Sequence, residues 1–355
     1  MMNDDTFPPH WCHTCRKDLQ SRKSLDEHES GKRHMKKQPY VQKRPLRSSI
    51  CPTIDEEELF RNLSNGEYRN IVVLTGAGVS TAAGVPDFRS PGGLFDTIRS
   101  TFGKRFPYVY DTPEIILSRD FVLMHPFIYQ DEVLPLLEHI GKSVDAQPTD
   151  THRFCAWLNH QGWLRRVYTQ NVDGLHLHPS LDIDEKLVVE CHGSVRGGDI
   201  VLYGDDLPKR FYNCCDEDFP QNIRDGVSRS CPADLLLVFG TSLKVLPFSA
   251  VPNLAPKGCV RVLINRSLED CMNQRSPQCS REEVYSNAGW LQSPSRLRVG
   301  SRKFVTARNL WTGREGNKRW RQLLVEGDCD YFIRRFLSTT RTSIHPWKQK
   351  GTTLK

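Results

Sequence analysis

A chain of 355 residues is long enough for one large catalytic domain with appendages. Its hydrophobic content of 38% and charged content of 26% are ordinary for a soluble protein. The lack of any apolar run of about 18 residues argues against a membrane span. The sequence starts without the pattern of a signal peptide, so we expect an intracellular protein whose twelve cysteines are thiols or metal ligands.

The net charge of +7 is concentrated in two segments. Residues 1–50 hold eleven Lys and Arg against six acids, and residues 291–322 hold nine against one acid. Such patches attract polyanions or acidic partners, although they also serve simply as solvated surface. The body between them is mildly acidic.

The first predicted element is a zinc finger over residues 10–37. Its four candidate ligands follow the spacing Cys-x2-Cys-x12-His-x5-His and are Cys12, Cys15, His28 and His34. Two thiolates and two imidazoles suit one structural zinc ion, and so small a segment needs the metal to fold. The histidine spacing and the ending SGKRH resemble the matrin-type Cys2His2 finger, which implies an RNA, DNA or protein partner. Residues 38–54 are a basic linker that also fits a nuclear-import signal.

A glycine-rich turn follows the first strand of the main domain. Residues 71–75 are a β-branched run typical of a buried parallel strand. Gly76, Gly78 and Gly84 suit a turn that a phosphate approaches closely. The chain then enters PDFRSPGGLF instead of placing an acid at the end of a second strand, which favours a mobile loop over a nucleotide and argues against a hydride-transfer enzyme.

The remaining elements alternate between strands and helices. Further strand-like runs are residues 166–169, 187–190, 200–203, 235–239 and 260–264. Helical patterns are residues 113–119, 128–140 and 151–160. The alternation predicts an α/β fold with a doubly wound, Rossmann-type parallel sheet and a small helical module. Because such sheets bind ligands beyond the carboxyl ends of their strands, we group the residues that follow strands into one site, namely Asn171, Asp173, His192, Gly240, Thr241 and Asn265.

Six motifs occur in the order seen in sirtuins, the NAD-dependent protein-lysine deacylases. They are GAGVSTAAGVPDFRSPGGLF, TQNVDGLH, HGS, GTSLKVLPF, INR and EGDCD. The resemblance runs from about Ile71 to Arg335 and implies a catalytic domain over residues 55–340. Insertions are expected at about 212–232 and 267–324, and a disordered tail at 341–355.

The resemblance implies NAD as the cofactor. The cofactor contacts that it implies are Gly76, Ala77, Gly78, Ser80, Asp87, Phe88, Arg89, Gln170, Asn171, Asp173, Gly240, Thr241, Ser242, Asn265 and Cys329. The glycine-rich turn is expected at the pyrophosphate, Gln170 and Asn171 at the ribose, Asp173 at the nicotinamide and Asn265 at the adenosine.

The same resemblance assigns the chemistry to His192 and Asn171. A neutral imidazole suits the general base that the ribose 2′-hydroxyl requires. Asn171 is expected to orient the ribose and a later water. The products would be free lysine, nicotinamide and acyl-ADP-ribose.

Two segments resemble the strands that flank a substrate peptide in sirtuins. Their expected peptide contacts are Val201, Tyr203, Gly204, Leu243 and Val245, which would add the acyl-lysine protein, a histone among the candidates, as an extra strand. The Tyr-x-x-Arg pattern for acidic acyl groups is absent, because the sequence reads FDTI after the paired glycines. We expect an acetyl or a longer apolar acyl group.

The zinc ribbon of most sirtuins is not expected here. Only residues 195–199 separate HGS from the next segment, and they contain no cysteine. We expect Cys191, Cys214, Cys215 and Cys231 to be free thiols. The later insertion interleaves tryptophans with bases, which fits either nucleic-acid contact or packing against the body.

The sequence therefore predicts an NAD-dependent deacylase that acts on nuclear or chromatin proteins. Two alternatives remain: an NAD-dependent protein ADP-ribosyltransferase, and an inactive adaptor that binds nucleic acid or chromatin. The finger and the basic segments favour a nuclear location, and an additional cytoplasmic location is the alternative.

Overall fold

The computed structural model describes residues 11–12, 17–18, 54–141, 146–220, 232–256, 258–272 and 321–340. The chain divides into two units, residues 1–49 and 50–355. In the first unit, β1 (Trp11–Cys12) pairs antiparallel with β2 (Lys17–Asp18), so Cys12 lies in a short hairpin. Cys15, His28 and His34, the linker and the C-terminal tail lie outside the described residues.

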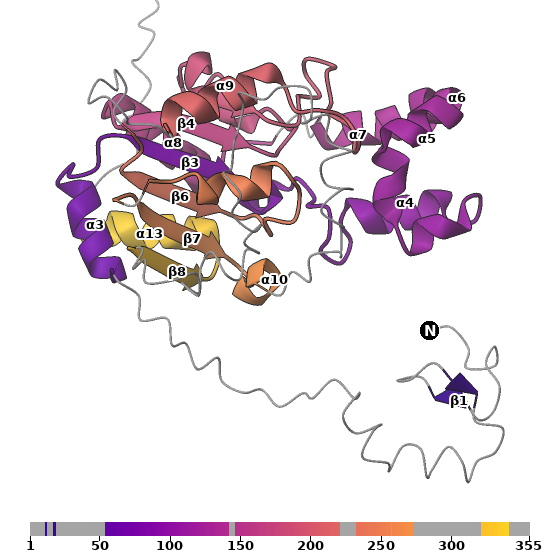
Figure 1. Ribbon diagram of the computed structural model, residues 1–355, viewed down its shortest axis with the longest axis horizontal. Coiled ribbons are helices and arrows are strands. Elements are labelled where there is room, and N and C mark those ends of the chain that lie inside the picture. The colour runs from indigo at the N-terminus through magenta and orange to yellow at the C-terminus, as the bar shows by residue number, and fades with distance from the viewer. Residues whose placement is uncertain are drawn as a thin grey trace, which may run out of the picture. The chain divides into compact units, whose positions relative to one another are not determined.

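The second unit is built on a parallel sheet of six strands (Figure 1). The strands are β3 (Ile71–Thr75), β4 (Leu164–Thr169), β5 (Val188–Glu190), β6 (Leu235–Phe239), β7 (Val260–Asn265) and β8 (Gln322–Glu326). Their order is β5-β4-β3-β6-β7-β8, and every neighbouring pair is parallel. This is the doubly wound Rossmann order, in which the direction of strand addition across the sheet reverses between β3 and β6. The predicted α/β class is confirmed.

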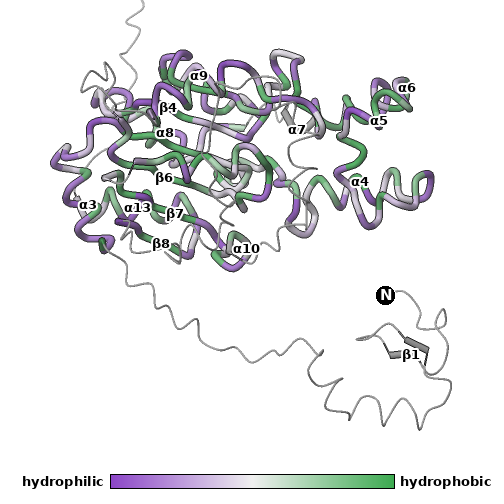
Figure 2. The backbone as a smooth tube through the Cα atoms, in the orientation of Figure 1, coloured by the Kyte–Doolittle hydropathy of each residue, from purple (hydrophilic) through white to green (hydrophobic). Residues whose placement is uncertain are grey.

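The central strands are apolar along their whole length because both faces of the sheet are covered. Every residue of β3 and β6 is buried, and these strands are green in the hydropathy view (Figure 2). Continuous apolar runs of this kind are expected when helices pack on both sides of a parallel sheet.

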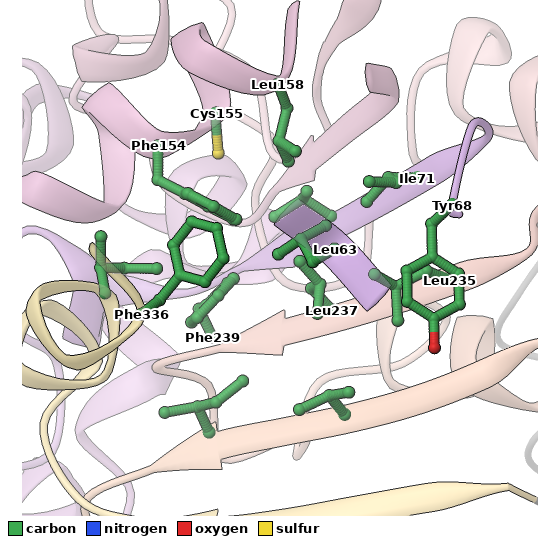
Figure 3. Packing of buried hydrophobic residues seen from close by; sticks show 14 of the residues in the cluster. Leu63, Tyr68, Ile71, Phe154, Cys155, Leu158, Leu235, Leu237, Phe239 and Phe336 are labelled. Atoms are coloured by element: carbon green, nitrogen blue, oxygen red, sulfur yellow. The ribbon is translucent and has the colours of Figure 1, made fainter. Parts of the chain in front are cut away.

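On one face lie α3 (Glu56–Ser64), α8 (Asp150–His160) and α13 (Cys329–Thr340). Phe154 of α8 and Phe336 of α13 contact edge to face, with ring centroids 5.7 Å apart, and Phe239 of β6 lies beside them (Figure 3). These residues share one hydrophobic cluster with Leu63 of α3. On the other face α9 (Lys209–Asp218), the short helix η9 (Phe248–Asn253) and α10 (Leu268–Met272) form a second cluster.

A helical module extends from the sheet between β3 and α8 (Figure 1). Its elements are α4 (Leu94–Phe102), η4 (Pro107–Tyr110), η5 (Pro113–Leu117), α5 (Arg119–Met124), α6 (Pro126–Ile128), η6 (Tyr129–Val133) and α7 (Leu134–Gly141). The module has its own hydrophobic core, which contains Ile98, Phe102 and Phe121. Throughout the described part of the chain, no helix has the length and apolarity needed to cross a membrane.

The expected strand over residues 200–203 was wrong. Tyr203 makes only an isolated parallel bridge with Ser118, because its N–H donates to the Leu117 carbonyl and its own carbonyl accepts from the Arg119 N–H. These backbone groups are used by the helical module and are not available to the sheet.

Two expected insertions overlap regular elements of the body. Tyr212 lies inside α9, whose Phe211 and Cys215 are buried against the sheet. Gln322 starts β8, the edge strand beside β7. What the structure describes of both segments thus belongs to the second unit, while residues 221–231 and 273–320 lie outside the described residues.

Candidate functional site

A cavity of about 450 Å³ lies at the carboxyl ends of the strands, where the sheet order reverses. Most of the residues predicted from the sequence line it. These are Ala77, Gly78, Asp87, Phe88, Arg89, Gln170, Asn171, His192, Val201, Tyr203, Gly204, Gly240, Thr241, Ser242, Val245, Asn265 and Cys329. Segments as far apart in the chain as Ala77 and Cys329 are therefore brought to one site.

Four predicted residues lie outside the lining. Gly76 is packed against Thr241, and a Cβ atom at Gly76 would lie 2.6 Å from that of Thr241. Ser80 and Asp173 lie in a layer of buried polar side chains beside the lining. Leu243 has a positive φ of 52° and its fully buried side chain belongs to the sheet core, so only its backbone could contact a peptide.

The glycines of two loops allow their backbones to touch. Gly78 N–H donates to the Gly240 carbonyl at 2.9 Å. A Cβ at Gly78 would lie 2.8 Å from Gly240 Cα, and Gly240 itself has a positive φ of 57°. Larger residues would separate the turn after β3 from the turn after β6, which together form one wall of the cavity.

A chain of hydrogen bonds fixes Asn171 and Asp173. Ser80 Oγ donates to Asp173 Oδ2 at 2.7 Å and accepts from Asn171 Nδ2 at 3.0 Å. Asp173 Oδ1 accepts from the Leu175 N–H at 2.9 Å. Asn171 Oδ1 is buried without a hydrogen-bond partner among the described residues. A buried acceptor of this kind is costly unless a ligand satisfies it, and Asn171 lines the cavity.

Gln170 links the turns that follow β4 and β6. Thr241 Oγ1 donates to Gln170 Oε1 at 2.7 Å, and the same hydroxyl accepts from the Leu243 N–H at 3.1 Å. This fixes the oxygen end of the Gln170 amide, so the side chain enters the cavity in a defined orientation.

His192 follows β5 and lies beside Gln170. Its Nδ1 is 3.2 Å from the Gln170 carbonyl oxygen, which can only accept, so Nδ1 carries the ring proton and Nε2 is the basic nitrogen. Burial lowers the pKa of His192 to about 4, although the bond to Gln170 opposes the shift. The imidazole is therefore neutral at physiological pH.

Glu190, two residues before His192, is the group near the site that titrates close to neutrality. Burial raises its pKa to about 7, while a hydrogen bond to Ser194 opposes the shift. The carboxylates of Asp199 and Asp173 add to the increase. Sequence reasoning did not single out Glu190, because no motif distinguishes it from an ordinary strand end.

The loop after the glycine-rich turn is held by Asp87. Its Oδ1 accepts from the N–H groups of Arg89 and Ser90, at 3.0 and 2.7 Å. The Arg89 guanidinium lies 5.0 Å from the Phe95 ring centroid. It also lies near Tyr203, where burial raises the pKa of the phenol and the Arg89 charge opposes that shift. Arg89 thus joins the loop to the segment expected to bind the peptide.

A second link joins that segment to the helical module. Arg119 at the start of α5 makes a bidentate ion pair with Asp205, at 2.8 and 2.7 Å. Leu117 and Leu137 of the module line the cavity. For Leu117, Arg119 and Leu137 the sequence offered no signal beyond ordinary helix patterning.

The far end of the cavity is formed after β7. Asn265 Nδ2 donates to the Ser267 carbonyl at 2.8 Å and lies 3.2 Å from Cys271 Sγ. Cys271 in turn lies 3.3 Å from the Thr241 carbonyl. Cys329, the first residue of α13, completes this end.

The described residues fit a dinucleotide. The site combines a glycine-rich turn after the first strand, an unpartnered amide oxygen at Asn171 and polar side chains at the sheet reversal. For zinc, the hairpin that carries Cys12 is the part of the finger that the structure describes. Elsewhere in the described residues, no group of three or more His, Cys, Asp or Glu side chains is arranged to hold a metal ion.

Comparison with known proteins assigns two regions. The Sir2 family matches residues 76–198, and the zinc-finger of C2H2 type matches residues 10–34. The chain is 33% identical over 258 residues to the NAD-dependent deacetylase sir2A of Dictyostelium discoideum, which covers 60% of this chain and 44% of that protein. It is 31% identical over 250 residues to the NAD-dependent protein deacetylase sirtuin-2 of Danio rerio, covering 59% of each.

A fungal relative is covered more fully. The NAD-dependent protein deacetylase hst2 of Schizosaccharomyces pombe is 30% identical over 246 residues, which are 59% of this chain and 67% of that protein. The chain thus spans about half to two thirds of the length of these three relatives.

Proposed function

This chain belongs to the Sir2 family, and we propose that it is an NAD-dependent protein-lysine deacylase. The relatives it matches are named as deacetylases, which supports this reaction class. The cavity at the sheet reversal is the proposed active site.

The residues that would hold NAD come from the turns that follow β3, β4, β6 and β7. The turn after β3 would receive the pyrophosphate, and Asn171 Oδ1 would accept a ribose hydroxyl. Asp173 is proposed for the carboxamide, and Asn265 for the adenosine end. When bound, NAD would supply the ADP-ribose group that accepts the acyl group, and nicotinamide would be the leaving group.

His192 is the proposed general base. Its Nδ1 proton is held toward the Gln170 carbonyl, so the unprotonated Nε2 is the atom that can remove a proton from the ribose 2′-hydroxyl. Asn171, anchored through Ser80, would keep that hydroxyl in place. This fixed neutral tautomer in the cavity lining is the observation that carries the proposal.

The substrate is an acyl-lysine protein, and acetyl-lysine is the first choice. An extended peptide would lie between residues 201–204 and the backbone near Val245, both of which line the cavity. Leu117 and Leu137 give the adjacent wall an apolar character, in keeping with acetyl or longer apolar acyl groups. Nuclear or chromatin substrates are proposed from the finger and the basic segments.

The test is mass spectrometry of an acetyl-lysine histone peptide incubated with the full chain and NAD. Nicotinamide is measured in parallel, with His192→Ala as the inactive variant and His160→Ala, an exposed histidine of α8, as the matched control. We expect one nicotinamide to be released for each lysine that is deacetylated. His192→Ala should lose both nicotinamide release and deacetylation, and His160→Ala should keep them.

Two results would replace the proposal. Labelled ADP-ribose that remains on protein would identify ADP-ribosyl transfer. A folded chain without turnover of acetyl or longer acyl peptides would favour the binding adaptor.

A further inference from the structure

Two buried histidines that the proposed mechanism does not use touch each other next to the glycine-rich turn. His152 comes from α8 and His176 from the short helix η7 (Leu175–Leu177). Their side chains are fully or almost fully buried, at 0% and 2% exposure, and their ring centroids lie 4.5 Å apart. Neither residue lines the cavity.

Each histidine is connected to a different end of the turn. His176 Nε2 lies 2.9 Å from the hydroxyl of Thr75, the last residue of β3. Thr149, which caps α8, donates its hydroxyl to the Val79 carbonyl at 2.9 Å and contacts His152 Nδ1 at 2.8 Å. The segment from Thr75 to Val79 is thus held at both ends by the two histidines and Thr149.

The protons of this network can be assigned from its donors. The Thr149 N–H donates to His152 Nδ1 at 3.2 Å, which makes this nitrogen an acceptor. That holds whichever of its two close neighbours, His152 Nδ1 or the Val79 carbonyl, takes the single hydroxyl proton of Thr149. His152 Nδ1 therefore only accepts, which puts the proton of the neutral ring on Nε2. Nε2 is buried and has no hydrogen-bond partner among the described residues, and the same is true of His176 Nδ1.

A donor, His152 Nε2–H, and a second nitrogen without a partner, His176 Nδ1, thus lie on two touching rings. His176 Nδ1 is an acceptor when the proton of its ring is on Nε2 and is donated to the Thr75 hydroxyl 2.9 Å away. We infer that His152 Nε2–H is donated to His176 Nδ1, and that the joined pair is a positioning device that holds the turn Thr75–Val79 in the shape that receives NAD. The identity of the nucleotide rests on the proposed function, whereas the pairing does not. A buried donor and a buried acceptor that stay unpaired each carry a desolvation cost, which favours their pairing.

The electrostatic surroundings keep both rings neutral, as the arrangement requires. Burial lowers the pKa of His152 to about 3, and the nearby Arg153 and His178 lower it further. Burial also lowers the pKa of His176, with His152 acting in the same direction and Asp173 opposing it. Each ring then has one proton, so that His152 can donate while His176 accepts.

The pair also reaches the other side of the cofactor site. Leu175, the first residue of η7, donates its N–H to Asp173, and Asp173 accepts from Ser80 in the turn. The histidines, α8 and the loop after β4 therefore form one connected support. A change in the pair should weaken NAD binding and leave the rate of the chemical step nearly unchanged.

Two substitutions remove only the contact between the rings. His152→Asn keeps an amide oxygen where Nδ1 accepts from Thr149 but has no group at Nε2. His176→Gln keeps an N–H for the Thr75 hydroxyl but has no acceptor at Nδ1. The matched controls are His160→Asn on the exposed part of α8 and His178→Gln, two residues after His176.

The dissociation constant of NAD is measured by titration calorimetry on the full chain, together with the KM for NAD and kcat. We expect each substitution to weaken NAD binding about tenfold, with kcat within about twofold, and the controls to bind like the wild type. The double variant should bind NAD no more weakly than the single variant with the lower NAD affinity, because either change alone already breaks the shared hydrogen bond.

Two results would overturn the pairing. One is a lower melting temperature with unchanged NAD affinity, which would indicate a merely structural role. The other is an additive loss of about a hundredfold in the double variant. Because calorimetry needs no turnover, a chain that binds NAD without deacylating a peptide would refute the proposed function and leave this test intact.

Discussion

His192 and Gln170 are joined by a hydrogen bond of 3.2 Å from the imidazole Nδ1 to the backbone carbonyl oxygen. The side-chain oxygen of Gln170 also accepts a hydrogen bond from the Thr241 hydroxyl. One residue therefore orients the proposed base and links two turns of the site. The tautomer of His192 is therefore set by the backbone, and no carboxylate among the described residues hydrogen-bonds its ring.

The first prediction concerns the pH dependence of catalysis. Because burial lowers the pKa of His192 to about 4, its neutral form persists well below pH 6. We expect kcat/KM for the peptide to show no acid limb from His192 between pH 8 and about 5, whereas an ordinary histidine would give one near pH 6.5. The measurement is a pH profile of kcat/KM in the wild type.

Glu190 supplies the control for that profile, since its pKa is raised to about 7. Any limb near pH 7 should disappear in Glu190→Gln. A limb near pH 6.5 that persists in Glu190→Gln would show that His192 titrates normally and that the burial argument fails.

The second prediction concerns the link between the helical module and the peptide segment. Asp205→Asn removes the charge that Arg119 holds through two hydrogen bonds. We expect the KM for the acyl peptide to rise about threefold, because partly exposed pairs contribute less than about 1 kcal/mol. The KM for NAD should stay unchanged in the same steady-state assay.

Asp206→Asn is the matched control, because Asp206 is the adjacent exposed carboxylate. An equal effect of both substitutions on the peptide KM would mean that the charge of the segment matters and the ion pair with Arg119 does not.

The third prediction concerns the attachment of α9 to the sheet. Asp218 is fully buried and accepts from Arg165, Arg166 and the Tyr168 hydroxyl, at 2.7 to 3.1 Å. Asp218→Asn leaves two guanidinium groups without their buried counter-charge. We expect the free energy of unfolding in urea to fall by about 3 to 5 kcal/mol.

Glu217→Gln gives the contrast on the same helix. Glu217 also pairs with Arg166, but its side chain is 60% exposed, so we expect a loss below about 1 kcal/mol. Similar losses for the two variants would contradict the claim that burial sets the strength of this network.

The fourth prediction concerns zinc. The finger predicts one zinc ion per chain, and Cys12→Ser should release it without abolishing NAD-dependent turnover, because residues 1–49 form a separate unit. Metal content by plasma mass spectrometry and nicotinamide release measure the two quantities. Two zinc ions per chain, of which one survives Cys12→Ser, would overturn the expectation that the catalytic unit lacks a zinc ribbon.

The sequence by itself determined the inner strands of the sheet and most of the cavity lining. Ile71–Thr75 and Leu235–Phe239 were predicted at their observed bounds, because a strand buried on both faces must be apolar along its length. Residues such as Asn171 and His192 could be grouped because parallel strands end at one edge of a sheet, whatever their distance in sequence. Glycine turns also carry their signal locally, through conformations that other residues avoid.

Only the tertiary structure decided which partners the polar groups chose. Residues 200–203 have the composition of a strand, yet Tyr203 bonds the helical module, and Leu243 turns inward from a motif expected to face the peptide. The pairing of His152 with His176 likewise joins two elements whose separate sequences give no sign of each other. Local composition fixes how a segment can fold, but a hydrogen bond or ion pair between distant segments depends on the packing that brings them together.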